Sequence, residues 1–180
     1  MDPLFLGTLI GIIVGSLGTY IILSQFNAKN KTESKRKKVL VSGCFDLLHS
    51  GHIKFFEEAS KYGNLYVRLG TDKNIELLKH HKPMFPENER LYMVKNIKYV
   101  YNAELSAGTG VYDFEEDMRI LKPDIYFVNE DASKMDGRVK ICKKYGIQYV
   151  CKPREPEQGL TKRSSTSIKA TINDKNKSKK

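Results

Sequence analysis

Short apolar runs alternate with longer segments of helical periodicity over most of the chain. Residues 38–42 are apolar up to a glycine, and residues 53–63 follow with apolar positions three and four apart, which predicts a strand and then a helix. Further strands are predicted at 65–69, 125–128 and 148–151, and further helices at 72–79, 87–97, 113–121 (capped by Asp113) and 134–145. Strands separated by helices favour parallel pairing with right-handed crossovers. We therefore expect an α/β fold: a Rossmann-like doubly wound parallel sheet with helices on both faces.

Residues 3–23 stand apart from this pattern because they contain no charged residue. As a helix they would span roughly 31 Å, the thickness of a bilayer's hydrocarbon core, so they predict one N-terminal transmembrane helix. The alternatives are a buried core helix and a signal peptide, but a basic n-region is missing. Basic residues follow the segment and only Met1 and Asp2 precede it. The positive-inside rule then predicts a single-pass membrane protein whose C-terminal domain is cytoplasmic.

This reading divides the chain into four parts: a transmembrane anchor at 1–25, a basic linker at 26–37, one α/β domain at 38–170 and a basic disordered tail at 171–180. Within the anchor, Gly7, Gly11 and Gly15 recur every fourth residue. Such a stripe lets a second helix approach closely, which favours a homodimer, although glycine is also simply common in membrane helices.

The charge distribution and the cysteine content argue against several classes of protein. The 180 residues carry a formal net charge of +10, but the excess lies at 29–38 and 162–180, and the intervening residues are neutral overall. A neutral body lacks the basic face that nucleic acid requires, so we expect no nucleic-acid partner, whereas basic flanks beside an apolar segment suit an anionic membrane. The three cysteines form no C-x-x-C pair, which argues against a zinc ribbon or a disulfide framework.

The segment with the most candidate functional residues follows the first predicted strand and reads Ser42-Gly-Cys-Phe-Asp-Leu-Leu-His-Ser-Gly-His52. Ligands of open parallel sheets bind beyond the carboxyl ends of strands, and a helix N-terminus there offers free N–H groups to phosphate. His49 and His52 can both donate N–H to a phosphate as charge builds on its oxygens. The alternatives are a metal pair and two incidental histidines. A third ligand is lacking nearby, so no metal site is predicted.

The strand, the G-x-F-D element and H-x-G-H occur here in order, and this string resembles the nucleotidyltransferase superfamily, particularly its cytidylyltransferase-like family, over about residues 38–170. The resemblance implies transfer of a nucleotidyl group from an NTP to a phosphorylated acceptor with release of pyrophosphate, and Mg²⁺ on the phosphates. It implies that Asp46 orders the loop. The expected nucleotide-binding residues in this segment are Gly43, Cys44, Phe45, Asp46 and Gly51.

Two later segments are similar to further motifs of the family. The lysine-rich stretch at 79–82 and the E-x-R helix imply that Lys79 or Lys82 neutralises triphosphate oxygens and that Arg90 stabilises a phosphate. For either lysine the alternative is a solvated basic loop. Catalytic roles are thus expected for His49, His52, Lys79 and Arg90, and a nucleotide-binding role for Lys82.

The last family motif resembles R-T-x-G-x-S-T-[ST], and this chain departs from it. Hydroxyls before a helix can bind phosphate or simply cap the helix, and the candidates are Ser164, Ser165 and Thr166. Arg163 is the expected phosphate clamp, with Arg154 left open because the segment is lengthened. Asp131 is expected near the base or the acceptor, although Asn129 replaces the family's glycine.

The helix around residues 82–98 is similar to that of ethanolamine-phosphate and glycerol-phosphate cytidylyltransferases, which favours CTP as the donor and a headgroup or polyol phosphate as the acceptor. The segment at 43–46 equally resembles sugar-phosphate adenylyltransferases, so ATP with a sugar phosphate is the first alternative. A membrane-tethered, non-catalytic nucleotide-binding scaffold is the second, favoured by the altered segment 154–167.

Overall fold

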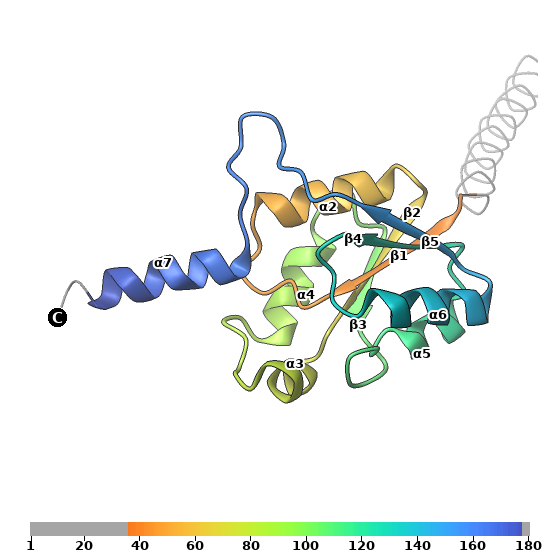
Figure 1. The fold of residues 1–180 in the computed structure, drawn as a ribbon, viewed down its shortest axis with the longest axis horizontal. Helices are drawn as coiled ribbons and strands as arrows, with labels where there is room; N and C mark the ends of the chain where they lie inside the picture. The colour runs from red at the N-terminus through yellow and green to blue at the C-terminus, as the bar shows by residue number, and fades with distance from the viewer. Residues whose placement is uncertain (1–35, 178–180) are drawn as a thin grey trace, which may run out of the picture. The chain divides into compact units, whose positions relative to one another are not determined.

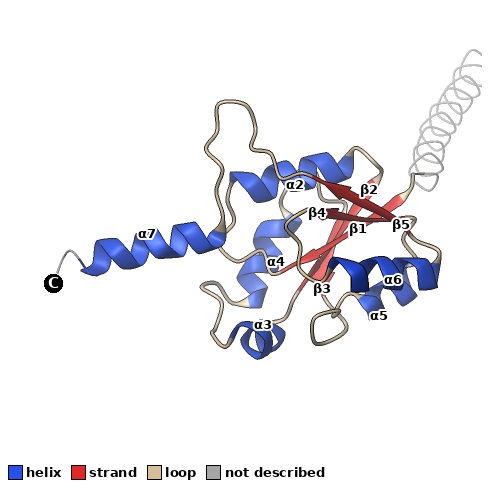
Figure 2. Cartoon of the chain, viewed as in Figure 1, coloured by secondary structure: helices blue, strands red, loops and turns tan. Residues whose placement is uncertain are grey.

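Within residues 36–177, which the computed structural model describes, five parallel strands form one sheet (Figures 1 and 2). In chain order the strands are β1 Lys38–Gly43, β2 Asn64–Leu69, β3 Asn102–Leu105, β4 Ile125–Asn129 and β5 Gln148–Lys152, and their order across the sheet is β3-β2-β1-β4-β5. All four pairings are parallel, as predicted. The chain therefore winds outward in both directions from β1.

Helices cover both faces of this sheet. The helices of the described residues are α2 Ser50–Ser60, α3 Asp72–Lys79, α4 Glu87–Lys95, α5 Glu115–Leu121, α6 Met135–Tyr145 and α7 Ser165–Lys177. Helix α7 runs away from the sheet (Figure 1). On one face, side chains of α2 and α4 such as Phe56 and Val94 pack on Val39 and Val67. On the other, side chains of α5 and α6 pack on Leu40, Tyr126 and their neighbours. The doubly wound architecture expected from the sequence is confirmed.

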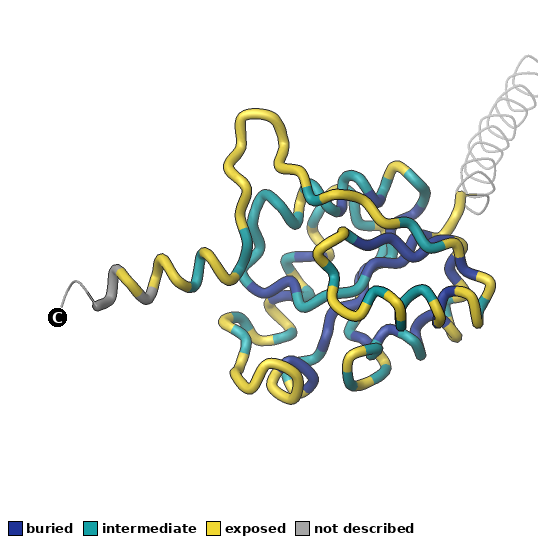
Figure 3. Tube along the Cα trace, viewed as in Figure 1, coloured by how far each residue is buried: buried dark blue, intermediate teal, exposed yellow. Residues whose placement is uncertain are grey.

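The apolar composition of β1 and β4 explains why these strands lie at the centre of the sheet. Val39, Leu40 and Val41 of β1 are completely buried, and β4 is buried over four of its five residues, which is the continuous apolar pattern of a strand covered on both faces (Figure 3). The direction of winding reverses between β1 and β4. The carboxyl ends of these two strands therefore mark the switch point at which such sheets bind ligands.

The predicted helices and strands match the observed ones within a few residues, with three differences. The edge strand β3 was not predicted. Helix α5 begins at Glu115 after Phe114, so Asp113 is not its cap. Helix α7 continues to Lys177, into the segment for which a disordered tail was expected.

The membrane part of the fold prediction requires a correction. In the described range, 36–177, the structure contains no helix with the length and apolar character needed to cross a bilayer. The predicted transmembrane helix, and the single-pass membrane localisation inferred from it, are therefore not supported by the structure. The apolar segment 3–23 and its glycine stripe lie outside the described residues, and neither enters the account below.

Candidate functional site

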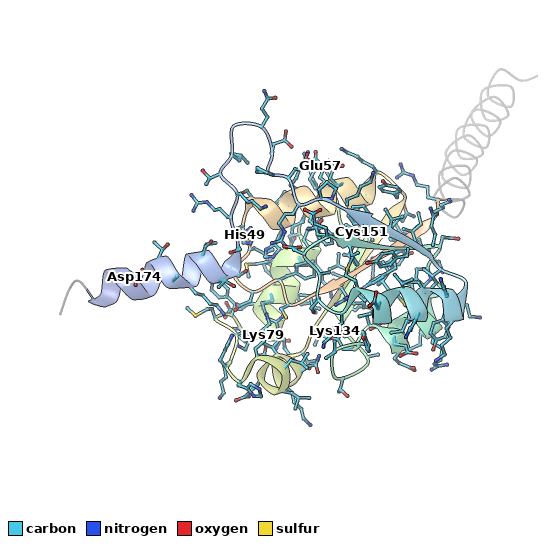
Figure 4. The ribbon with its side chains drawn as sticks, viewed as in Figure 1. His49, Glu57, Lys79, Lys134, Cys151 and Asp174 are labelled. Carbon is cyan, nitrogen blue, oxygen red and sulfur yellow. The ribbon has the colours of Figure 1, made fainter. Side chains whose placement is uncertain are left out.

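A cleft of about 530 Å³ opens at the carboxyl ends of β1, β2 and β4. Its lining comes from the loop after β1, the start of α2, helix α3, the loop before α5 and the loop between β4 and α6. Figure 4 labels His49 before α2, Lys79 at the end of α3 and Lys134 before α6. Lys79 and Lys134 line the cleft, whereas His49 is not part of the lining. The volume suits a nucleotide-sized ligand.

The two histidines of H-x-G-H lie together at the start of α2. His49 is the N-cap residue, and its Nδ1 accepts a hydrogen bond from the backbone N–H of Gly51 at 3.1 Å. Because Nδ1 acts as an acceptor, the ring is neutral and carries its proton on Nε2. The His52 ring stacks on it, with ring centres 3.9 Å apart and planes 25° from parallel, and it lines the cleft. The pair is therefore fixed in position before any ligand binds.

Both imidazoles favour the neutral form. Burial, followed by the neighbouring His49 and Arg154, lowers the pKa of His52 to about 3. Burial, Arg154 and Arg163 also lower the pKa of His49. Nδ1 of His52 is buried and has no hydrogen-bond partner within residues 36–177. A neutral ring carries one N–H group, which can donate a hydrogen bond to a phosphate oxygen.

The loop that leads into α2 depends on two glycines and contains two residues with a positive φ, Phe45 and Leu47. Phe45 has a φ of 48°, an unusual left-handed conformation for an aromatic residue, and its ring packs edge-on against His52 with centres 5.5 Å apart. A Cβ on Gly43 would come within 3.0 Å of the Phe45 ring, and a Cβ on Gly51 within 3.0 Å of the His49 ring. Both glycines therefore keep space for the rings that position the site.

Asp46 joins this loop to two distant segments. Its carboxylate accepts hydrogen bonds from the N–H groups of Met84 and Phe85 at 3.0 to 3.2 Å and pairs with Lys169 of α7 at 2.8 Å. Burial raises the pKa of Asp46, but these hydrogen bonds outweigh it and hold the pKa below its ordinary value. The ordering role expected for Asp46 thus has a direct geometric basis.

Arg90 does not reach the cleft. Its side chain is fully buried, and its guanidinium donates hydrogen bonds to the carbonyl oxygens of Phe85, Cys44 and Gly70 and to the Asp72 carboxylate, at 2.6 to 3.1 Å. It is absent from the lining of the cleft. Its position is that of a residue that holds the loops after β1 and β2 together rather than one that contacts a phosphate.

The other predicted cations divide between the cleft and its surroundings. Lys79 lines the cleft, whereas Lys82 is exposed and does not. Arg154 lines the cleft and forms an ion pair with Asp131 at 3.0 Å, but the Arg163 side chain is not part of the lining. Of the two arginines considered from sequence, the structure therefore brings Arg154, not Arg163, to the cleft.

The three hydroxyl residues at the start of α7 differ in their position relative to the cleft. Ser165 lines the cleft and donates a hydrogen bond to the backbone oxygen of Asp46 at 2.7 Å. Ser164 is a helix cap, since its hydroxyl accepts from the Ser167 N–H at 3.1 Å. Thr166 is exposed and lies outside the lining. Ser165 is thus the hydroxyl best placed for a ligand.

Several lining residues were not found from sequence. Asp113, in the loop before α5, accepts a hydrogen bond from Nδ2 of the buried Asn74 at 3.0 Å. The Asn74 amide also pairs with the backbone of Gly110, donating at 3.2 Å and accepting at 2.6 Å. Burial raises the pKa of Asp113, against the opposing hydrogen bond from Asn74. These contacts join residues more than 35 positions apart, so no local sequence signal announces them.

Arg138 of α6 is a further cation at the cleft. Its Nε donates to the Ser133 oxygen at 2.9 Å and its Nη1 to the Tyr126 hydroxyl, which in turn lies 2.8 Å from the Ser42 hydroxyl of β1. The guanidinium carbon lies 4.8 Å from the centre of the Phe114 ring, a cation–π distance. The arginine is therefore anchored from three sides at the edge of the cleft.

The donor set does not form a metal site of its own. Within residues 36–177, no group of three His, Cys, Asp or Glu side chains is placed to hold a metal ion. The carboxylates that line the cleft, Asp46, Asp113 and Asp131, are each engaged with a different partner. A Mg²⁺ ion that enters this cleft would therefore depend on the phosphate oxygens of its nucleotide for most of its ligands.

Comparisons with solved structures support this architecture. The lipopolysaccharide core biosynthesis protein from Thermoplasma volcanium is 28% identical, with a TM-score of 0.56 over 68% of this chain and 99% of that one. Pantothenate synthetase from Thermus thermophilus shares the fold, with a TM-score of 0.51 at 14% identity over 74% of this chain and 64% of that one.

Sequence comparisons identify relatives named FAD synthase. Those from Methanolacinia petrolearia and Aciduliprofundum boonei are 38% and 37% identical over 108 and 113 residues, which cover 56% and 62% of this chain and 69% and 73% of the relatives. For that from Methanohalobium evestigatum, 40% identical over 96 residues, the match covers 52% of this chain and 60% of the relative, less than two thirds of its length. The family model described as cytidylyltransferase-like matches residues 40–171. The chain therefore belongs to the cytidylyltransferase-like family of the H-x-G-H nucleotidyltransferase superfamily.

Proposed function

We propose that this protein transfers an adenylyl group from ATP to flavin mononucleotide (FMN), forming FAD and pyrophosphate. The observation that carries the reaction type is the pair of stacked, neutral histidines at the start of α2, beside a nucleotide-sized cleft at the switch point of the sheet. The relatives named FAD synthase support the choice of donor and acceptor, because FAD consists of FMN joined to an adenylyl group.

The chemistry is one in-line displacement. An oxygen of the FMN phosphate attacks the α-phosphorus of ATP, a new P–O bond forms, and the bond to the bridging oxygen of the β-phosphate breaks, so that pyrophosphate leaves with the bonding electrons. Such a step requires alignment and stabilisation of charge rather than a covalent intermediate on the protein.

Three sets of groups in and beside the cleft suit this task. Nε2–H of His49 and the His52 ring can donate hydrogen bonds to α-phosphate oxygens, where negative charge grows in the transition state. The start of α2 adds the positive end of the helix dipole. Lys79 and Arg154, both in the lining, can neutralise the departing pyrophosphate. Mg²⁺ bound to the phosphates would supply further charge neutralisation.

The relatives correct the sequence-based preference for CTP. Cytidylyl transfer was favoured on the likeness of one helix to lipid-headgroup enzymes, whereas relatives that cover more than half of this chain are named for a product that contains adenine. A second candidate is adenylyl transfer to a sugar phosphate, favoured by the 28% identical lipopolysaccharide core biosynthesis protein.

A matrix of donors and acceptors tests this proposal. ATP and CTP would each be incubated with FMN, a sugar 1-phosphate, glycerol 3-phosphate and phosphoethanolamine, in the presence of Mg²⁺, with pyrophosphate release and the dinucleotide product measured together. We expect FAD and pyrophosphate in equal amounts from ATP with FMN. Products with a sugar phosphate alone would favour the second candidate, and nucleotide binding without pyrophosphate in any pair would favour a non-catalytic scaffold.

A further inference from the structure

One lobe of the cleft has polar groups that the transfer of the adenylyl group does not use. Among them are Asp113 in the loop before α5, Asn74 of α3 and Arg138 of α6, all of which line the cleft. Asn74 holds Asp113 and the backbone of Gly110 in place at the same time. The lobe is thus built by side chains already fixed in position.

The carboxylate of Asp113 is a poor partner for phosphate. Two anions at short distance repel each other, and burial makes the repulsion stronger. The phosphates of both substrates are therefore directed to the side of the cleft that holds the histidine pair and Arg154. A carboxylate in the other lobe is left to accept hydrogen bonds from an uncharged N–H or O–H group of the acceptor.

Arg138 supplies the complementary donor. Asp113 and Phe114 are consecutive, the Arg138 guanidinium stacks over the Phe114 ring at 4.8 Å, and Asp113 and Arg138 both act electrostatically on the Tyr126 hydroxyl. An acceptor and a donor therefore belong to the same lobe. A ligand edge that alternates hydrogen-bond acceptors and donors would satisfy both.

The apolar lining beside these groups suits a flat ring. Val111 and Leu78 are 38% and 42% exposed although they are large and apolar, and both line the cleft together with the buried Ile75. Apolar surface that remains exposed inside a pocket indicates a ligand that covers it. A planar aromatic system with one polar edge fits this combination.

We propose that this lobe recognises the imide edge of the isoalloxazine ring, with Asp113 accepting from N3–H and Arg138 donating to an adjacent carbonyl oxygen. The inference rests on the proposed FAD synthase function and assigns the residues that would select a flavin over other phosphorylated acceptors. Asn74 is then a positioning residue, because it acts through Asp113 and the Gly110 loop.

The experiment compares FMN with 3-methyl-FMN, in which the N3–H donor is replaced by a methyl group. Binding is measured by quenching of flavin fluorescence on the full chain, so the readout does not depend on turnover. We expect the wild-type protein to bind 3-methyl-FMN about tenfold or more weakly than FMN, because a hydrogen bond to a charged group is lost. Equal affinities for the two flavins would overturn the proposal without any variant.

Variants refine this comparison. Asp113→Ala should weaken binding of FMN by about tenfold and reduce its preference for FMN over 3-methyl-FMN to less than about threefold, while binding of ATP is unchanged. Arg138→Gln should weaken both flavins alike. The matched controls are Asp136→Ala and Lys140→Gln, which change exposed residues of α6 outside the cleft and should bind FMN as the wild type does.

The outcomes separate this inference from the proposed function. FAD formation by the wild type with no discrimination against 3-methyl-FMN would overturn the assignment of the lobe and leave the function standing. Absence of FMN binding and of FAD formation would overturn both. FAD formation together with discrimination that survives in Asp113→Ala would overturn the role of Asp113, and loss of that discrimination supports it.

Discussion

The ring of His49 stacks on the ring of His52 with centres 3.9 Å apart while its own Nδ1 caps the backbone of Gly51. The His49 side chain thus caps the N-terminus of α2 and also holds the His52 ring in position. The cap requires an unprotonated Nδ1, so the orientation of Nε2–H toward a ligand and the integrity of the helix start are linked.

Replacement of either histidine should abolish most of the activity. We expect His52→Ala and His49→Asn each to reduce kcat by about a hundredfold, since removal of one preorganised donor costs on the order of 3 kcal/mol in the transition state. The measurement is FAD formation at saturating ATP and FMN. His81→Ala, an exposed histidine outside the cleft, is the control. Normal kcat in both site variants would refute their catalytic role.

The buried histidine should make the protein less stable in acid. The pKa of His52 is lowered to about 3 in the folded protein, whereas in the unfolded chain it returns to about 6.5. Between these values the unfolded state takes up a proton that the folded state does not, so stability falls as the pH decreases. We expect the free energy of unfolding of the wild type to decrease more steeply between pH 6 and 4 than that of His52→Gln, by up to about 1.4 kcal/mol per pH unit. Urea unfolding at several pH values measures both slopes, and parallel slopes would contradict the prediction.

Loss of the buried Arg90 guanidinium should lower the stability of the fold rather than only reduce the rate of catalysis. Arg90→Met leaves three carbonyl oxygens and the Asp72 carboxylate without their donor, and we expect a loss of roughly 3–5 kcal/mol in the free energy of unfolding. Chemical denaturation measures this, with Lys95→Met on the exposed side of α4 as the control. A variant of normal stability with reduced nucleotide affinity would instead restore a direct role in phosphate binding.

The contacts of Asp46 predict that its replacement weakens the local structure at Met84 and Phe85. Asp46→Asn removes the charge that pairs with Lys169 and weakens the acceptor for the N–H groups of Met84 and Phe85. We expect a destabilisation of about 1–3 kcal/mol and faster hydrogen exchange at these two amides. Asp174→Asn, an exposed change on α7, should leave exchange there unaltered. Unchanged protection in Asp46→Asn would show that the loop is held by other contacts.

The parts of the fold with strong local signals could be predicted from the sequence. The valine-rich β1, the alternation of strands and helices, and the placement of H-x-G-H at the first crossover depend on composition over a few adjacent residues. Strand β3 gives no such signal, because Asn102–Leu105 is short and only Ala103 is fully buried. It forms because β2 offers an edge to pair with, which is a tertiary effect.

The site residues likewise divide into those that have a local sequence signal and those whose position depends on the tertiary structure. The histidines and Asp46 were found because they lie within one string, whereas Arg90 was interpreted as a phosphate ligand from its charge and from the resemblance of the E-x-R helix to a family motif. Its burial depends on the loops after β1 and β2 closing around it. Asp113 and Arg138 reach the cleft only after α5 and α6 have packed on the sheet, so their position is a property of the tertiary structure.

The most direct test of the central claim is a crystal structure of the protein with Mg²⁺ and a non-hydrolysable ATP analogue. We expect α-phosphate oxygens to lie within hydrogen-bond distance of Nε2 of His49 and of the His52 ring, with the triphosphate against the start of α2. A nucleotide bound elsewhere, or imidazoles that make no contact with its phosphates, would contradict it.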